Sequence, residues 1–249
     1  MAHRQTQTEW ENEMCLKILD VIRSELYLDF RYLDMALSAL TWSSNEQIHT
    51  FATDGSSLFF SREQILRVFR NNPLFLNRAY LHSIFHCIFR HLWMRGSREP
   101  AIWNLACDIA VEWTIDSFEK KSTRRTLSLR RMNYYKHLKE EHIPVTAAAI
   151  YHDLLAITDH EEQAALQFEF YTDDHRFWPR DPSQSPSSAR AGENWEKIGR
   201  RVSKEMELKG RQDGDALSSV QTQISQGRSR RSYREFLRKF TVLKEELQC

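Results

Sequence analysis

Glycine and proline are scarce in this chain of 249 residues, which holds only seven of the first and six of the second. Tight turns depend largely on these two residue types, so their scarcity favours a largely helical fold. Long uncharged apolar runs are missing as well, and none approaches the roughly 20 residues that a membrane-spanning helix needs. The first residues, "MAHRQTQTEWENE", lack the apolar core of a signal peptide. We therefore expect a cytoplasmic protein.

The sequence also lacks paired cysteines and an excess of charge of either sign. Its four cysteines stand far apart and never form a CxxC pair, which argues against a disulfide framework and against a thiolate zinc knuckle. Lysine and arginine number 35 against 34 acidic residues. The resulting net charge of +1 excludes a strong overall attraction to nucleic acid or to an anionic membrane, so any such binding must be local.

What is present is the composition of a globular domain, with 41% hydrophobic and 12% aromatic residues. Apolar residues recur at helical spacing from residue 9 to 40, and Asp54-Gly55 between two β-prone runs predicts a hairpin. Pro73 and Pro100 each suit the first turn of a helix. They predict one helix from Pro73 to about Met94 and a second one over 101–118. Shorter helices are predicted over 63–70, 145–155, 161–170 and 195–208. The fold class is α+β, predominantly α-helical, with a small β-hairpin or sheet.

The chain divides by composition into three parts. Residues 1–180 have the pattern of one domain, whereas 181–232 are rich in serine and polar residues and predict a partly ordered linker with one candidate helix. Residues 233–249 include "YREFLRKFTVLKEEL", an amphipathic helix that ends without a cap. The missing cap favours a natural chain that continues past Cys249.

One stretch, "YLHSIFHCIFRHLW", carries histidines within an apolar run. His82 and His86 are four residues apart and share one face of a helix, close enough to bind one ion. His91 lies about 180° round that helix from His82. No glycine separates it from His86, so we expect His91 to point away. A zinc hydrolase would carry glutamate at the position of Ser83.

The next predicted helix, "AIWNLACDIAVEWTID", is apolar except for a polar stripe that repeats every four residues: Asn104, Asp108, Glu112 and Asp116. Buried acidic groups are costly unless they are paired or bind a cation. The short loop after Met94 makes the two helices antiparallel, so the stripe can face His82 and His86. Two imidazoles and a carboxylate suit zinc with an open fourth position, while pairing of these acids with arginine or histidine explains the stripe equally simply.

Several motifs together resemble a known family. "TDGSSLFFS", "LHSIFHCIFRHLWMR", "REPAIWNLACDIAVE", "DDHRFW" and "YREFLRKFTVLKEEL" are similar to the N-terminal metallopeptidase domain of bacterial VWA-like proteins, whose genes accompany MoxR-type AAA ATPases. The resemblance covers roughly Leu26 to Trp178 and the last fifteen residues. It implies a zincin-like helix pair in which His82, His86 and Asp108 are the metal ligands.

Two positions depart from that family's pattern. Ser83 replaces the glutamate that would activate a water molecule, and Glu112 stands where the family usually has asparagine. A serine hydroxyl is too weak a base for that role. Glu112 could serve as a relocated general base, could complete a closed ligand set, or could pair with the histidines of a site without metal.

The sequence therefore leaves three functional hypotheses. The favoured one is a degenerate, non-catalytic metallopeptidase-like domain. It acts as a binding or regulatory module for a MoxR-type ATPase or a VWA domain. One form of this hypothesis has the domain retain a zinc ion. The second is an active zinc peptidase with Glu112 as its base. The third is a nucleic-acid-binding module that uses Arg124, Arg125, Arg130 and Arg131. The VWA half has no counterpart here, so the natural chain either continues or has lost it.

"FYTDDHRFWPR" contributes Asp173, Asp174 and His175 beside two aromatic residues. A capped turn that packs Phe177 and Trp178 on the core explains this motif as well as the edge of a site does. The motif therefore adds no ligand to the set predicted above.

Overall fold

The computed structural model describes residues 5–181, 185–209 and 216–226. Its helices and strands follow one another as α1 (Gln7–Asp29), η1 (Arg31–Leu33), α2 (Asp34–Leu37), β1 (Thr41–Ser44), β2 (Phe51–Thr53), β3 (Ser57–Phe60), α3 (Arg62–Asn71), α4 (Pro73–Ile88), α5 (His91–Met94), α6 (Pro100–Ser117), η2 (Lys121–Thr123), α7 (Leu129–Glu140), α8 (Ala147–Ala156), α9 (His160–Phe170) and α10 (Pro186–Lys209). Residues 216–226 are also helical. The prediction of an α+β fold that is predominantly helical is confirmed.

The central element is α4, which is buried along nearly its whole length. Pro73 occupies its first turn, and the Asn72 side chain accepts a hydrogen bond from the backbone N–H of Phe75, so both signals of a helix start are used. From Leu76 to Ile88 every residue of α4 is buried. A helix that is buried on every side must be packed against other elements all round.

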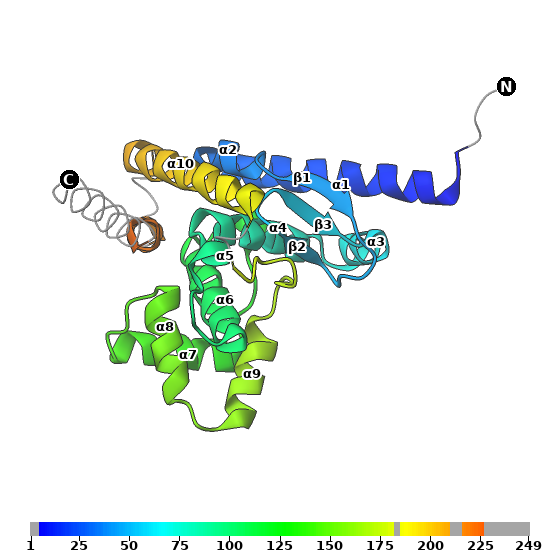
Figure 1. The fold of residues 1–249 in the computed structure, drawn as a ribbon. Coiled ribbons are helices and arrows are strands. Elements are labelled where there is room, and N and C mark those ends of the chain that lie inside the picture. Colours follow the sequence, from blue (N-terminus) through cyan, green and yellow to red (C-terminus); the bar gives the residue numbers. More distant parts are fainter. Residues whose placement is uncertain (1–4, 182–184, 210–215, 227–249) are drawn as a thin grey trace, which may run out of the picture.

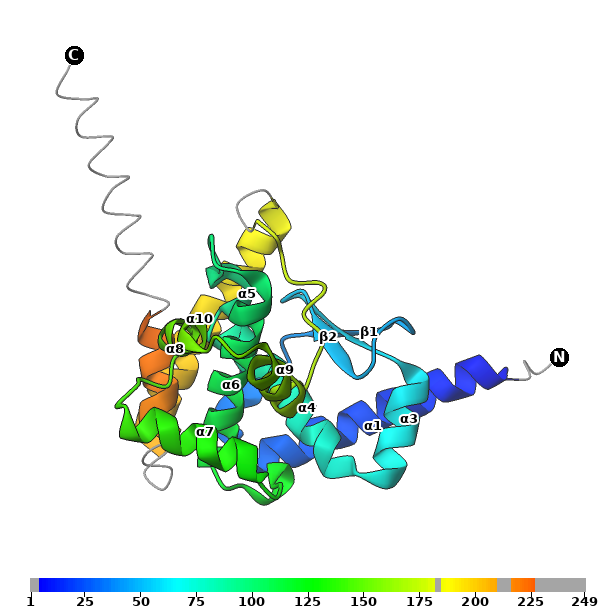
Figure 2. The ribbon, with the colours of Figure 1, turned by 90° about the horizontal axis from the view of Figure 1, so that it is seen from below.

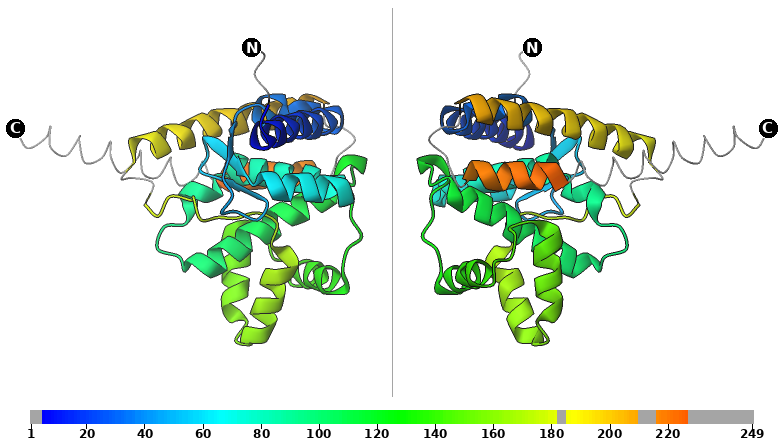
Figure 3. Two further views of the ribbon diagram at one scale, coloured as in Figure 1. Left: turned by 90° about the vertical axis from the view of Figure 1, so that its right-hand side faces the viewer. Right: turned by 90° about the vertical axis from the view of Figure 1, so that its left-hand side faces the viewer.

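Those neighbours form two hydrophobic cores that meet at α4 and α6. The first core joins α1, α3, α4, the sheet, α10 and residues 216–226, and the second joins α6 to α7, α8 and α9. Figures 1 and 3 show α1 and α10 at one end of the molecule and α8 and α9 projecting at the other. Trp178 packs against both cores. The boundary between the two cores therefore runs beside α4 and α6.

The sheet is small and has the strand order β1-β3-β2. β2 and β3 form the antiparallel hairpin that Asp54-Gly55 predicts, with Gly55 at φ +88. β1 pairs in parallel with β3, and this third strand is not predicted from the sequence. The sheet lies beside α4 and α3, as Figure 2 shows from below. The outer edge of β2 forms an isolated bridge through Ala52 with Asp174.

Residues after 180 contribute more helix than the sequence predicts. α10 begins at Pro186 and not near Trp195, because Pro186 fits a first helical turn and "SSARAGE" continues it. One face of α10 is buried in the first core through Trp195, Ile198, Val202 and Met206. The predicted C-terminal helix of 233–249 lies outside the described residues, and the division into domains stays a prediction.

The buried cysteines Cys15, Cys87 and Cys107 are free thiols. Among the described residues, no helix combines the length and the apolar character that crossing a membrane requires.

Candidate metal centre

Two antiparallel helices face each other with matched polar side chains. On α4 the spacing of four residues puts Arg78, His82 and His86 in one row. Across from them, α6 presents Asp116, Glu112 and Asp108 in the reverse order, so that Arg78 meets Asp116 and Glu112 and His86 meets Asp108. The antiparallel helix pair and the facing of the acidic stripe are thus as predicted.

A third segment joins the site from beyond α9. Asp174 forms a bridge with Ala52 on the outer edge of β2, and its backbone N–H donates to the carbonyl of Phe51 at 2.8 Å. Successive side chains of extended chain point to opposite sides. Asp173 and His175 therefore project together toward α4, while Asp174 turns outward and accepts from Arg176 at 2.7 Å.

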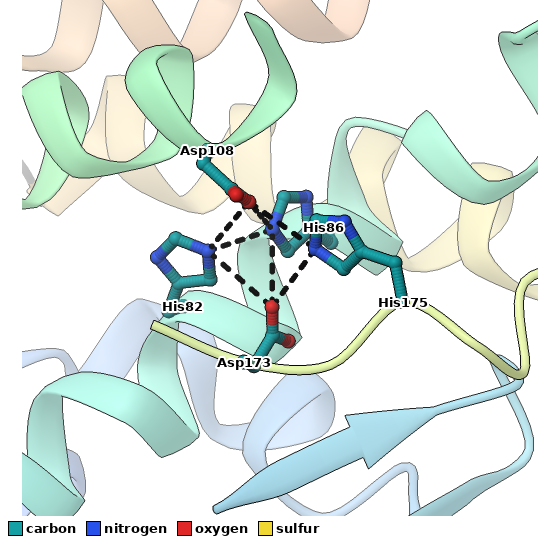
Figure 4. A group of neighbouring side chains, drawn as sticks. All are labelled: His82, His86, Asp108, Asp173 and His175. Atoms are coloured by element: carbon teal, nitrogen blue, oxygen red, sulfur yellow. Dashed lines mark hydrogen bonds and ion pairs between the residues drawn. The ribbon is translucent and has the colours of Figure 1, made fainter. Parts of the chain in front are cut away.

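Five side chains from these three elements converge: His82, His86, Asp108, Asp173 and His175. Each offers one nitrogen or oxygen, and the five atoms all lie within 4.8 Å of one another. Figure 4 shows the three imidazoles and two carboxylates directed at a common centre. The sequence predicted three of these residues as metal ligands. For Asp173 and His175 it allowed either the edge of a site or a capped turn.

The separations between these atoms suit a shared cation. The Oδ1 of Asp108 lies 3.3 Å from the Nε2 of His82 and 3.2 Å from that of His86. The Oδ1 of Asp173 lies 3.6 and 3.7 Å from the same two nitrogens. Donors bound to one zinc ion at about 2.1 Å stand roughly 3 to 3.4 Å apart. The gaps to Asp108 fall in this range, those to Asp173 lie slightly above it, and the Nε2 atoms of His82 and His86 are closer, at 2.7 Å.

Unsatisfied polar atoms give an independent test of this fit. His175 Nε2 and Asp173 Oδ1 are buried and only 2.9 Å apart, yet neither makes a well-directed hydrogen bond. Buried polar atoms are nearly always satisfied. Atoms that are aimed at a point between them, and not at each other, fit the geometry of metal ligands.

Outer partners fix the orientation of His82. Its Nδ1 lies 2.8 Å from the Oε1 of Glu112, so this nitrogen carries the proton that the carboxylate accepts. When the ring gives up its second proton, the Nε2 lone pair faces the centre. Glu112 Oε2 accepts from Arg78 at 2.7 Å and also from Arg131. Such outer contacts set the tautomer and basicity of a metal ligand.

His91 does not point away, and that prediction is wrong. α4 ends at Ile88 because Arg90 adopts a left-handed conformation at φ 63, which breaks the helix without a glycine. The break turns His91 back, and its Nδ1 lies 2.9 Å from the Nδ1 of His86. His91 therefore partners His86 as Glu112 partners His82, and the predicted single helix to Met94 is two helices.

Burial and charge divide the histidines into two groups. Burial lowers a histidine pKa, but the Asp173 charge and the hydrogen bonds to Asp108 and Glu112 outweigh it and raise the pKa of His82 to about 9. Asp108 and Asp173 likewise raise the pKa of His175 to about 10 against its burial. Burial and the neighbouring His82 lower the pKa of His86 to about 4.

The carboxyl groups are all held in the charged form. Burial opposes ionisation, yet the nearby histidine charges hold the pKa of Asp108 well below its usual value and that of Asp173 at about 2. For Glu112 the charges of Arg78 and Arg131 outweigh burial and keep its pKa well below the usual range. Two buried carboxylates at one centre thus require positive charge there, which protonated imidazoles or a bound cation can supply.

The centre is closed to solvent. The side chains of His82 and Asp173 are fully buried, and those of Asp108 and His175 are 8% and 7% exposed. Trp178 stacks on His175 with ring centroids 3.8 Å apart and meets the edge of His86 at 4.9 Å. Ser83, at the position of the activating glutamate, donates from Oγ to Asp173 Oδ2 at 2.6 Å. It thereby holds a carboxylate in place.

Comparison with known families decides what this arrangement is related to. A family model described as "Putative metallopeptidase domain" matches residues 23–241. The chain belongs to this family. The matched range includes all five converging residues and Glu112. Neither a search of curated proteins nor one of solved structures finds a match.

Membership in the metallopeptidase-domain family agrees with the geometry of the centre. The structure brings together His82, His86 and Asp108, and their role as metal ligands stays a prediction. It places Glu112 behind His82, outside the group of five. The motif "DDHRFW" contains the two residues that were not predicted, a carboxylate and an imidazole two positions apart, but its spacing does not indicate that they meet the helix pair.

Proposed function

We propose that this domain binds one divalent transition metal ion through His82, His86, Asp108, Asp173 and His175, and that it does so without hydrolysing peptides. The observation that carries the proposal is the convergence of five buried donors around one centre, with Ser83 tied to Asp173 in place of an activating glutamate. Nitrogen and carboxylate donors suit zinc, which is the first candidate. When bound, the metal would supply positive charge at a centre that otherwise gathers two carboxylates.

The outer residues support a rigid, structural role for the ion. His82 and His86 each use Nδ1 for a protein partner and keep Nε2 for the centre. The Ser83 hydroxyl holds the second oxygen of Asp173. Catalytic zinc sites keep an open position that substrate can reach, whereas structural sites are closed. The burial of these side chains favours the closed kind.

Glu112 is poorly suited to act as a general base. Its two oxygens accept from His82, Arg78 and Arg131, and its pKa lies well below the usual value. A base that works near neutral pH needs a pKa close to that pH and access to a proton of the substrate. The positions of these arginines therefore favour a non-catalytic module over a zinc peptidase with a relocated base.

We further propose a protein partner, a MoxR-type AAA ATPase or a VWA domain, which rests on the family resemblance. Large apolar side chains on the surface of α7 and α9 support a protein interface in general: Leu129 is 69% exposed and Phe168 89%. Nucleic acid is a weaker candidate. Arg131 is fully buried and Arg130 lies 3.7 Å from Glu162, so the basic stretch does not form a continuous cationic surface.

Elemental analysis tests the metal. Protein purified without chelators is compared with His86→Ala and with a control, His137→Ala, whose imidazole is partly exposed and pairs with Asp153. We expect about one metal ion per chain in the wild type and the control and none in His86→Ala. Absence of stoichiometric metal in the wild type, or its full retention in His86→Ala, contradicts the proposed centre.

A peptidase assay tests the second half of the proposal. The metal-loaded wild type is incubated with unfolded protein and with a mixed peptide library, and products are followed by mass spectrometry. We expect no cleavage above that of His86→Ala. Metal-dependent cleavage by the wild type would replace the non-catalytic function with a hydrolytic one while leaving the metal centre in place.

A further inference from the structure

A second polar cavity lies at the far end of the α4–α6 pair from the metal centre. It has a volume of about 330 Å³ and is bounded by the start of α4, the end of α6 and residues 119–127. Four basic and two acidic side chains line it: Arg78, Lys120, Arg124, Arg125, Asp116 and Glu119. None of the four is among the proposed metal ligands, and the cationic groups outnumber the acidic ones.

The segment that carries Arg124 and Arg125 is anchored on the core at three points. The backbone N–H of Ser122 donates to Asp29 at 3.0 Å, and its carbonyl accepts from the amide of Asn77 at 3.1 Å. One residue further on, the carbonyl of Thr123 accepts from Arg78 at 3.1 Å. A fixed backbone reduces the entropy that the two arginines lose when they close on a ligand.

Arg125 shares the nearby carboxylates with two other arginines. Arg78 and Arg131 contact Glu112 and Asp116 directly, and Arg125 lies 3.9 Å from Glu112 and 3.4 Å from Glu169. Burial and then the charge of Arg131 lower the pKa of Arg125. Its guanidinium therefore lies close to like charge, with the side chain 33% exposed. An anion beside it would relieve that repulsion.

Arg124 follows the same anchored segment and is exposed at the cavity. Among the described residues it forms no ion pair, so its guanidinium is available to a ligand. Guanidinium groups bind planar and tetrahedral oxyanions with paired hydrogen bonds, and such charge-assisted bonds are about twice as strong as neutral ones. Two adjacent arginines that line one cavity fit an anion with several oxygens.

We propose that this cavity binds a small doubly charged oxyanion, inorganic phosphate or a phosphoryl group, through Arg124 and Arg125. Lys120 lies on the same wall and adds positive charge. The ligand occupies the space between these side chains and the end of α6. The inference does not rest on the metal centre, since none of the five converging donors lines the cavity.

The test is a titration with inorganic phosphate and, separately, with O-phosphoserine, followed by calorimetry at fixed ionic strength. Wild type is compared with Arg124→Gln and Arg125→Gln, and with Arg130→Gln as the control. Arg130 belongs to the same basic stretch, is 48% exposed and lies outside the cavity. Circular dichroism and thermal unfolding establish that each variant is folded.

We expect saturable 1:1 binding that weakens about tenfold or more in Arg124→Gln and Arg125→Gln and less than about twofold in Arg130→Gln. Tighter binding of O-phosphoserine identifies a phosphoryl group on a larger molecule as the ligand, and equal or weaker binding identifies the free anion. Lack of saturable binding by both probes overturns the proposal. Equal weakening in all three variants overturns it too, because general surface charge then explains the binding.

Discussion

Ser83 donates a hydrogen bond of 2.6 Å from its Oγ to the Oδ2 of Asp173, and the other oxygen of that carboxylate faces His82 and His86. In a zinc hydrolase of the same helix pattern, the residue at this position is a glutamate that acts on water. Here the short hydroxyl leaves room for a carboxylate that arrives from a distant segment. In the proposed centre, the residue at this position therefore supports a ligand and takes no part in proton transfer.

Ser83→Ala should therefore weaken metal binding without abolishing it. Loss of an outer hydrogen bond to a ligand typically lowers metal affinity by about 10- to 100-fold. Competition with a chromophoric chelator measures the change. Ser117→Ala is the control, because its hydroxyl only bonds to the carbonyl of Trp113 within α6. An affinity that stays within twofold of wild type in Ser83→Ala would argue against the supporting role.

His91→Phe should also weaken metal binding, in this case through His86. The phenyl ring keeps the volume but removes the acceptor for the Nδ1 proton of His86, which lies 2.9 Å away. We expect metal affinity to fall by about 10- to 100-fold, with the fold retained. His152→Phe, at an exposed position on α8, should leave affinity unchanged. An unchanged affinity in His91→Phe would show that His91 only fills space.

The row of side chains between α4 and α6 was predictable from sequence because helical spacing alone determines it. His82 and His86 are four residues apart, as are Asp108 and Glu112, and a short connection makes the two helices antiparallel. Whether these residues bind an ion was not predictable in the same way. That depends on donors that arrive from elsewhere.

Three features could not be predicted, each for a physical reason. The turn at Arg90 adopts a conformation that costs an L-residue roughly 1–2 kcal/mol, so sequence rules argue against it. Tertiary contacts compensate: Arg90 pairs with Glu196 on α10 at 3.1 Å. Asp173 and His175 reach the centre only through pairing with the edge of β2, and β1 joins the sheet in parallel. Such long-range pairings leave no local periodic signal.

Glu112→Gln should destabilise the protein severely. The substitution removes the charge that balances Arg78 and Arg131, both of which are buried with it. Breaking a buried ion pair by removing one partner typically costs about 3–5 kcal/mol. Urea denaturation of the metal-free protein measures the loss. In the control Glu140→Gln the exposed pair with Lys136 is lost, and the free energy of unfolding should change by less than about 1 kcal/mol. A small effect in Glu112→Gln would mean that Asp116 and Glu169, which also pair with these arginines, are sufficient to balance them.

Metal binding should release protons, because the imidazoles that must offer a lone pair hold protons in the metal-free protein. The pKa values of His82 and His175 are raised to about 9 and about 10, so at pH 7 both rings are protonated. Their contribution to the stability of the metal-free fold is fully present below about pH 6.5 and is lost as the pH rises through 9 and 10. Metal affinity has the opposite dependence.

For each proton displaced, zinc affinity should rise about tenfold per pH unit between pH 7 and the raised pKa values. Calorimetric titration with zinc at pH 7, in two buffers with different ionisation enthalpies, gives the number of protons released, which we expect to be about two. His175→Ala removes one of the protonated rings and should bind zinc more weakly and release about one proton fewer. His137→Ala should match the wild type. Binding without proton release would show that both imidazoles are already neutral and that the carboxylates do not hold them in the charged form.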